Sequence, residues 1–202
     1  PILYLPRMLR FLSGLVLVKG QVISANQTLV VQALDTKVIA LLLYAESHER
    51  EELVQLISRS DHTLNPRGRL VYHIELIKLL ELTTRAHPSN VRWLRSQLPL
   101  QAMARMLQTR PMLPSLQMAY MQLLRNAFLA RDSQGASASS DLGIEAFKEV
   151  DIALRSHVTH YSQMAINGQD SALQQEAQEV LFDALLPALN ELYHRHPDLL
   201  KE

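Results

Sequence analysis

The feature that most constrains the fold is a helical repeat of apolar residues that recurs along most of the chain. The most regular example is this set of apolar residues, spaced three or four positions apart: Leu116, Tyr120, Leu123, Leu124, Ala127 and Phe128. Such spacing places them on one face of an α-helix. Apolar residues make up 48% of the chain but aromatic residues only 5%, so Leu, Ala, Ile, Val and Met must fill the core, as they do between packed helices. The sequence therefore predicts an all-α fold.

Similar stripes, separated by Pro, Gly and Asn, divide the chain into predicted helices. Up to position 131 the predicted helical ranges are 3–18, 23–45, 47–58, 70–86, 88–97, 99–109 and 116–131. The composition of 38–44 would also suit a buried strand, but no partner strand is evident, so a helix is expected there. Two long helices follow; the first ends at Asn167 and Gly168, and the second carries Pro187, which should kink it.

The predicted helices alternate between short and long at a spacing of roughly 40 residues, which is typical of armadillo and HEAT repeats. We therefore expect an armadillo-like or HEAT-like solenoid of about eight to nine helices, with a compact helical bundle as the alternative. The whole chain, 1–202, is predicted to be a single solenoid unit. Residues 132–140, which are rich in Ser, should form a flexible loop within it.

The chain has no net charge, but its charges are unevenly distributed. Residues 82–131 contain seven Arg and no acid, whereas residues 132–202 contain twelve Asp or Glu and only four Lys or Arg. The middle segment supplies a candidate basic face for an anionic partner: Arg85, Arg92, Arg95, Arg105 and Arg110. A solvated face is the favoured interpretation, an acidic protein partner or acidic neighbouring domain comes next, and nucleic acid is disfavoured because Trp93 is the one aromatic among these Arg residues.

Several classes of site are disfavoured or excluded by the sequence. The chain has no cysteine, which excludes disulfides and thiolate chemistry. His157, His160, His194 and His196 are interpreted as surface residues rather than zinc ligands. His73 is expected to be a core or interhelix residue, because no nucleophile or phosphate-binding loop accompanies it. Met103, Met106, Met112, Met118 and Met121 are expected to fill the core. We predict no enzyme, no cofactor and no metal site.

The ends and the apolar runs give two further expectations. The longest apolar run, 38–45, is far shorter than the roughly 20 residues of a membrane helix, so we expect no membrane contact by this segment itself. The chain begins at Pro1 rather than Met and has no signal-peptide pattern. We therefore expect it to be part of a longer protein.

Three segments resemble a known family. They are residues 70–80 (LVYHIELIKLL), 98–100 (LPL) and 118–126 (MAYMQLLRN). In order and spacing they are similar to the inositol trisphosphate receptor and ryanodine receptor family of intracellular calcium-release channels, whose central cytosolic region is an armadillo-like solenoid. The resemblance covers about residues 3–130.

The resemblance implies a function for a larger assembly. It implies a regulatory segment that transmits conformational change between the ligand-binding region and the pore of a tetrameric channel. The segment would lie on the cytosolic face of the endoplasmic reticulum or a related calcium store, and other domains or subunits of the channel would be its partners. The family's ligand pocket and pore lie outside the matching region, so no ligand, calcium or pore residue is carried over. The alternative is a free-standing armadillo-like scaffold that binds an acidic partner through the Arg-rich face.

Overall fold

The computed structural model describes residues 6–34, 69–108, 113–129, 144–167 and 171–200. Its contacts group into two compact units: Pro1–Pro99 with Thr109–Met112, and Leu100–Gln108 with Leu113–Glu202. The sequence predicts a single solenoid unit over 1–202. This organisation stays a prediction. The flexible loop predicted for 132–140 lies outside the described residues, as do the helix at 47–58 and the run 38–44.

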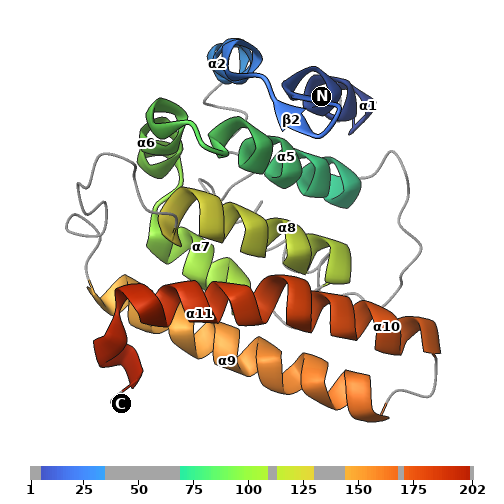
Figure 1. Ribbon diagram of the computed structural model, residues 1–202, viewed down its shortest axis with the longest axis vertical. Helices are drawn as coiled ribbons and strands as arrows, with labels where there is room; N and C mark the ends of the chain where they lie inside the picture. The colour runs from blue at the N-terminus through green and yellow to red at the C-terminus, as the bar shows by residue number, and fades with distance from the viewer. Residues whose placement is uncertain (1–5, 35–68, 109–112, 130–143, 168–170, 201–202) are drawn as a thin grey trace. The chain divides into compact units, whose positions relative to one another are not determined.

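The first unit consists of four described helices and a two-stranded hairpin (Figure 1). In chain order its elements are α1 (Pro6–Val16), β1 (Leu17–Val18), β2 (Gln21–Val22), α2 (Ser24–Ala33), α5 (Arg69–Thr84) and α6 (Pro88–Gln97). α1 packs along α5, and α2 contacts α1, α5 and α6. α5 is the central helix, because Leu76, Ile77, Leu79 and Leu80 on its different faces are all fully buried. This confirms the central helix predicted for 70–86.

The hairpin was not predicted. Leu17 pairs with Val22, and Val18 pairs with Gln21. The turn between them needs two left-handed residues, and both Lys19 (φ 49°) and Gly20 (φ 79°) adopt that conformation, which matches the right-handed twist of the strands. The helix predicted over 3–18 therefore ends at Val16, and Gly20 lies in the two-residue turn that joins the paired strands.

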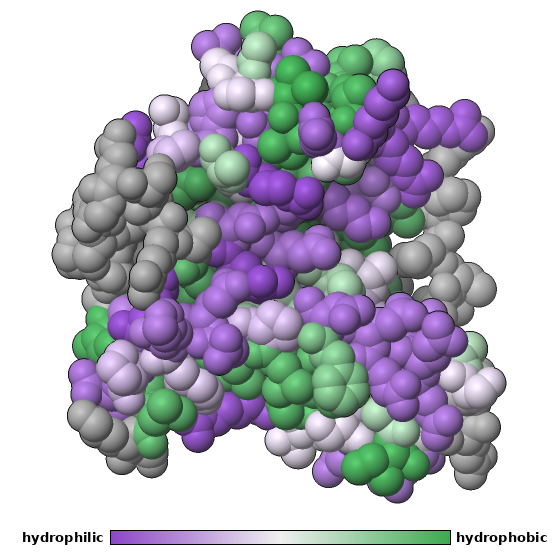
Figure 2. All heavy atoms as spheres, in the orientation of Figure 1, coloured by the Kyte–Doolittle hydropathy of each residue, from purple (hydrophilic) through white to green (hydrophobic). Residues whose placement is uncertain are grey.

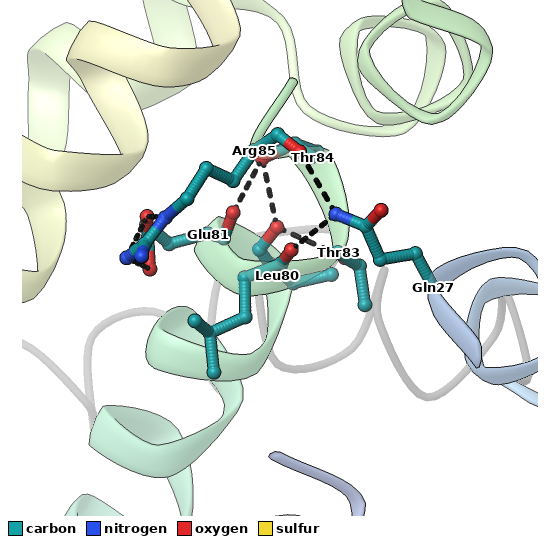
Figure 3. A network of polar contacts seen from close by, with 7 residues as sticks. Gln27, Leu80, Glu81, Thr83, Thr84 and Arg85 are labelled. Carbon is teal, nitrogen blue, oxygen red and sulfur yellow. Dashed lines mark hydrogen bonds and ion pairs between the residues drawn. The ribbon is translucent and has the colours of Figure 1, made fainter. Parts of the chain in front are cut away.

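A network of polar contacts holds the carboxyl end of α5 to α2 (Figure 3). The last carbonyls of a helix have no hydrogen-bond donor within it. Here the buried side-chain amide of Gln27 is the donor: its Nε2 donates to the carbonyl oxygens of Leu82 at 2.8 Å and Arg85 at 2.9 Å. The hydroxyl of Thr84 donates to the Leu80 carbonyl at 2.9 Å. α2 is thus fixed against α5 by directional bonds as well as by apolar packing.

The second unit is built around α9, which lies side by side with the helix formed by α10 and α11 (Figure 1). Its elements are α7 (Leu100–Leu107), α8 (Pro114–Leu124), the π-helical turn η1 (Arg125–Leu129), α9 (Ile144–Asn167), α10 (Ser171–Glu179), the π-helical turn η2 (Val180–Leu185), α11 (Leu186–Arg195) and the 3₁₀ turn η3 (Pro197–Leu200). α7 and α10 both pack on α9. Phe147, Val150 and Leu154 on α9 are fully buried, and their spacing of three and four places them on one side of the helix.

The last long helix changes its hydrogen-bond pattern at η2. The Leu186 N–H donates to the Leu181 carbonyl, five residues back, instead of four. Pro187 follows at once, and its missing N–H cannot donate to the carbonyl of Asp183 as an α-helix would require. A π turn therefore lies just before Pro187, while the kink expected there stays a prediction.

The all-α prediction is confirmed, since within the described residues the two short strands are the only β structure. Of the methionines within the described residues, Met103, Met106 and Met121 are buried, as expected for core filling. Both the solenoid and the compact bundle are arrangements of helices packed in this way, and the choice between them stays a prediction.

Candidate interaction surfaces

The five arginines of the predicted basic face do not fall in one unit. Arg85 directly follows α5, Arg92 and Arg95 lie on α6 in the same unit, and Arg105 lies on α7 in the second unit. Arg110 lies outside the described residues. The structure thus places three of the five together on neighbouring elements, and it describes no single face that contains all of them.

Arg85 is already engaged with an acid. Its guanidinium forms a two-pronged contact with the Glu81 carboxylate, Nε to Oε1 at 2.9 Å and Nη2 to Oε2 at 3.0 Å. Glu81 is almost fully buried, so the pair neutralises a charge that would be costly alone. On α6, Arg92 is exposed and Arg95 half-buried, and their spacing of three places them on one side of the helix. The predicted face within the first unit is therefore mainly Arg92 and Arg95.

A different surface emerges on α1. Met8, Phe11 and Leu15 are 55%, 62% and 42% exposed, and their spacing aligns them along one side of the helix. Leu9 and Val16, on another side, are buried, and α1 packs on α5. α1 is thus apolar on two sides, only one of which is covered by α5. Figure 2 shows apolar atoms gathered over α1.

Two arginines border this apolar stripe. Arg7 and Arg10 are exposed, and no acidic residue lies on α1. Arg10 also forms an ion pair across to α5, where its Nε lies 3.3 Å from Oε1 of Glu75. We define the α1 surface by its apolar stripe and these two arginines: Arg7, Met8, Arg10, Phe11 and Leu15. It is a basic, apolar surface.

Sequence reasoning missed the α1 surface. The apolar spacing within the helix predicted over 3–18 groups Leu15 with Leu9 and Val16 on one stripe, but the structure leaves Leu15 exposed and buries the other two. The signal that could have revealed it was the presence of Met8 and Phe11 off the inward stripe. The periodicity of a short helix with two apolar sides does not identify which side is covered.

Gly14 lies on the exposed part of α1, three residues after Phe11. A Cβ atom built at this position would meet nothing within 4 Å. Glycine in a helix interior is less favourable than alanine, and nothing in the described packing requires it. The α1 surface is therefore open at Gly14.

A second apolar surface lies on the helix formed by α10, η2 and α11. Phe182 and Leu186 are 61% and 39% exposed, and their spacing of four places them side by side. Glu179 and Asp183, both exposed, flank Phe182. We call these four residues the α10–α11 surface, and Figure 2 shows an apolar patch over this helix. It is an acidic, apolar surface.

The structure describes the four histidines that the sequence places on the surface. Within the described ranges, no three His, Cys, Asp or Glu side chains are placed to hold a metal ion. His157, predicted to lie at the surface, is fully buried, and its Nε2 makes a short hydrogen bond with the Leu107 carbonyl. That prediction is wrong because the carboxyl end of α7 packs on α9 at this point. His73 is fully buried, as expected for a core residue.

None of the helices within the described residues combines the length and the apolar character that a membrane crossing requires. Models of known protein families and the curated proteins give no match to this chain.

Proposed function

We propose that this chain is a non-catalytic helical segment that packs against a neighbouring helical segment through the α1 surface. The observation that carries the proposal is the exposed stripe of Met8, Phe11 and Leu15 on a helix whose other apolar side already packs on α5. A large apolar side chain gains about 1.5–3 kcal/mol when it is fully buried. Contiguous exposed apolar side chains bordered by polar ones are typical of interaction sites.

The sequence resemblance supports a more specific form of this proposal. In it, the chain is a regulatory segment of an intracellular calcium-release channel on the cytosolic face of the endoplasmic reticulum or a related store. An α1 surface that docks on an adjoining part of the channel would pass a movement from one helical element to the next, because packed helices shift as rigid pieces. The alternative scaffold, with a basic face, has less support, since Arg85 is paired and Arg105 lies in the second unit.

Hydrogen exchange tests the docking part. In the full-length protein, the amides of α1 should exchange at least about tenfold more slowly than in the isolated chain at a concentration where it is monomeric. Phe11→Asp should abolish that added protection, whereas Ile152→Asp, which alters an equally exposed apolar residue on α9, should leave it unchanged. Equal exchange of α1 in the two proteins would refute the docking role.

The full reading frame tests the channel part. We expect hydrophobic spans with a Gly-rich pore loop beyond this segment, and we expect Phe11→Asp to reduce calcium release evoked by inositol trisphosphate while the binding of that ligand is retained. A reading frame without membrane spans would refute the channel part and leave the docking part standing.

A further inference from the structure

We propose that the α1 surface of one copy docks on the α10–α11 surface of a second copy, so that copies associate head to tail. This inference rests on the proposed docking role of α1 and names its partner. The contact would join two different surfaces, one from each copy. Each surface is apolar at its centre and charged at its border.

The charges of the two surfaces are opposite. The α1 surface carries Arg7, which is exposed, and Arg10, whose Nε is 3.3 Å from Glu75 of α5, and it has no acid of its own, whereas the α10–α11 surface carries Glu179 and Asp183. No Lys or Arg occurs between residues 171 and 194, so the only Lys or Arg on this helix is Arg195, in the last turn of α11. Opposite charges at the border of an interface guide the approach and fix which faces meet. The affinity itself comes from the apolar centre.

Both surfaces have an exposed aromatic side chain at their apolar centre. Phe182 lies on the π-helical turn η2 and is 61% exposed, and Phe11 on α1 is 62% exposed. A Cβ atom added at Gly14, three residues after Phe11, would meet nothing within 4 Å, so this part of α1 is open to a docking side chain. Docking Phe182 on the α1 surface would cover Phe182, Phe11 and Leu15. Aromatic side chains buried at the centre of an interface often carry much of its binding energy.

The same charges disfavour the pairing of like surfaces. Two α1 surfaces would bring Arg7 and Arg10 of one copy against those of the other, and two α10–α11 surfaces would bring carboxylates together. Like charges across an interface oppose association. Of these combinations, only the head-to-tail contact joins a basic surface with an acidic one. Because this contact uses a different surface on each copy, it permits assemblies of more than two copies.

A mixing experiment with two blocked variants tests this pairing by sedimentation velocity. The wild-type chain should self-associate beyond a dimer, at concentrations up to about 100 μM, which spans the weak range for specific contacts. Phe11→Asp and Phe182→Asp should each weaken self-association at least about tenfold. When mixed, they should form a one-to-one pair, because one variant retains an intact α10–α11 surface and the other an intact α1 surface. Ile152→Asp serves as the matched control and should associate like the wild type.

The outcomes separate this inference from the proposed function. A mixture that does not pair, a Phe182→Asp variant that associates like the wild type, or a wild-type chain that stays monomeric would each overturn the head-to-tail contact. If α1 still gains hydrogen-exchange protection in the full-length protein, the docking role stands with a different partner. If α1 gains none while the blocked variants pair as expected, the surfaces recognise each other but the proposed role in the larger protein fails.

Discussion

The phenol hydroxyl of Tyr193 on α11 donates a hydrogen bond of 2.6 Å to Oδ1 of Asp151 on α9. The other carboxylate oxygen, Oδ2, lies 2.8 Å from Nε of Arg155, whose guanidinium stands 5.6 Å from the centre of the Tyr193 ring. Arg155 Nη2 also donates to the Leu199 carbonyl at 3.2 Å. One carboxylate therefore ties α11, and through Arg155 also η3, to α9.

Tyr193→Phe should lower the free energy of unfolding by about 1–2 kcal/mol, because it removes a hydrogen bond to a charged group while the ring remains. Urea unfolding followed by circular dichroism measures the loss. In an Asp151→Asn background the same substitution should cost clearly less, since the two residues interact directly. Equal costs in the two backgrounds would mean that the Tyr193 hydroxyl is not coupled to Asp151.

Gln27→Leu should destabilise the chain by about 2–3 kcal/mol, because two carbonyls at the end of α5 lose the donor that satisfies them in a buried site. Its neighbour Asn26 offers a matched control, since its amide donates to the Leu15 carbonyl in an exposed position at 2.7 Å. Asn26→Ala should cost at most about 1 kcal/mol. Chemical denaturation of both variants decides the ranking, and the reverse order would contradict the role assigned to Gln27.

The two described glycines should respond to alanine in opposite ways. Both have open space for a Cβ atom, but Gly14 is helical whereas Gly20 has a φ of +79°. Gly14→Ala should stabilise the chain by about 0.5–1 kcal/mol, because alanine favours the helix. Gly20→Ala should destabilise it by about 1–2 kcal/mol, the cost of a left-handed alanine. Thermal unfolding should shift upward for the first and downward for the second, and a downward shift for Gly14→Ala would show a contact that glycine alone permits.

Stability should fall on mild acidification partly through His196, whose ring lies 4.1 Å from that of Phe147. Burial, and then the charge of Arg195, lower the pKa of His196. The folded state thus binds a proton at His196 less readily than the unfolded state, in which the pKa of His is near 6.5. The contribution of His196 to stability is therefore present above about pH 6.5 and is lost as the pH falls through its pKa in the folded state.

His196→Phe removes this titration while it keeps an aromatic ring beside Phe147. The variant should therefore lose less of its unfolding free energy between pH 7.5 and 5.5 than the wild type does, as measured by urea unfolding at both pH values. An identical loss in the two proteins would show that His196 does not contribute to the acid sensitivity.

Much of the helical structure follows from local sequence. The apolar residues around Leu76 and Leu80 and the helix-starting prolines Pro88 and Pro114 give α5, α6 and α8 close to their predicted ranges. These signals are local because a helix satisfies its backbone within a few residues and shows its buried side as a period of 3.6. Proline acts equally locally, through its fixed φ and its missing N–H.

The candidate surfaces could not be predicted in the same way. The basic face was inferred from five arginines close in sequence, but their grouping depends on which helices pack together, and Arg85 finds its partner in Glu81 while Arg105 belongs to the other unit. The burial of His157 likewise depends on the Leu107 carbonyl, 50 residues away in sequence.

The sequence by itself determined that this protein is helical, where most of its described helices run, and that its charge is divided between a basic middle and an acidic end. Only the tertiary structure decided that Val16 faces inward and Leu15 outward, and that the chain turns back at Gly20. The physical reason is that α1 has apolar residues on two sides. Which side is covered is decided by packing on α5, more than 50 residues further along the chain, and no local pattern records that choice.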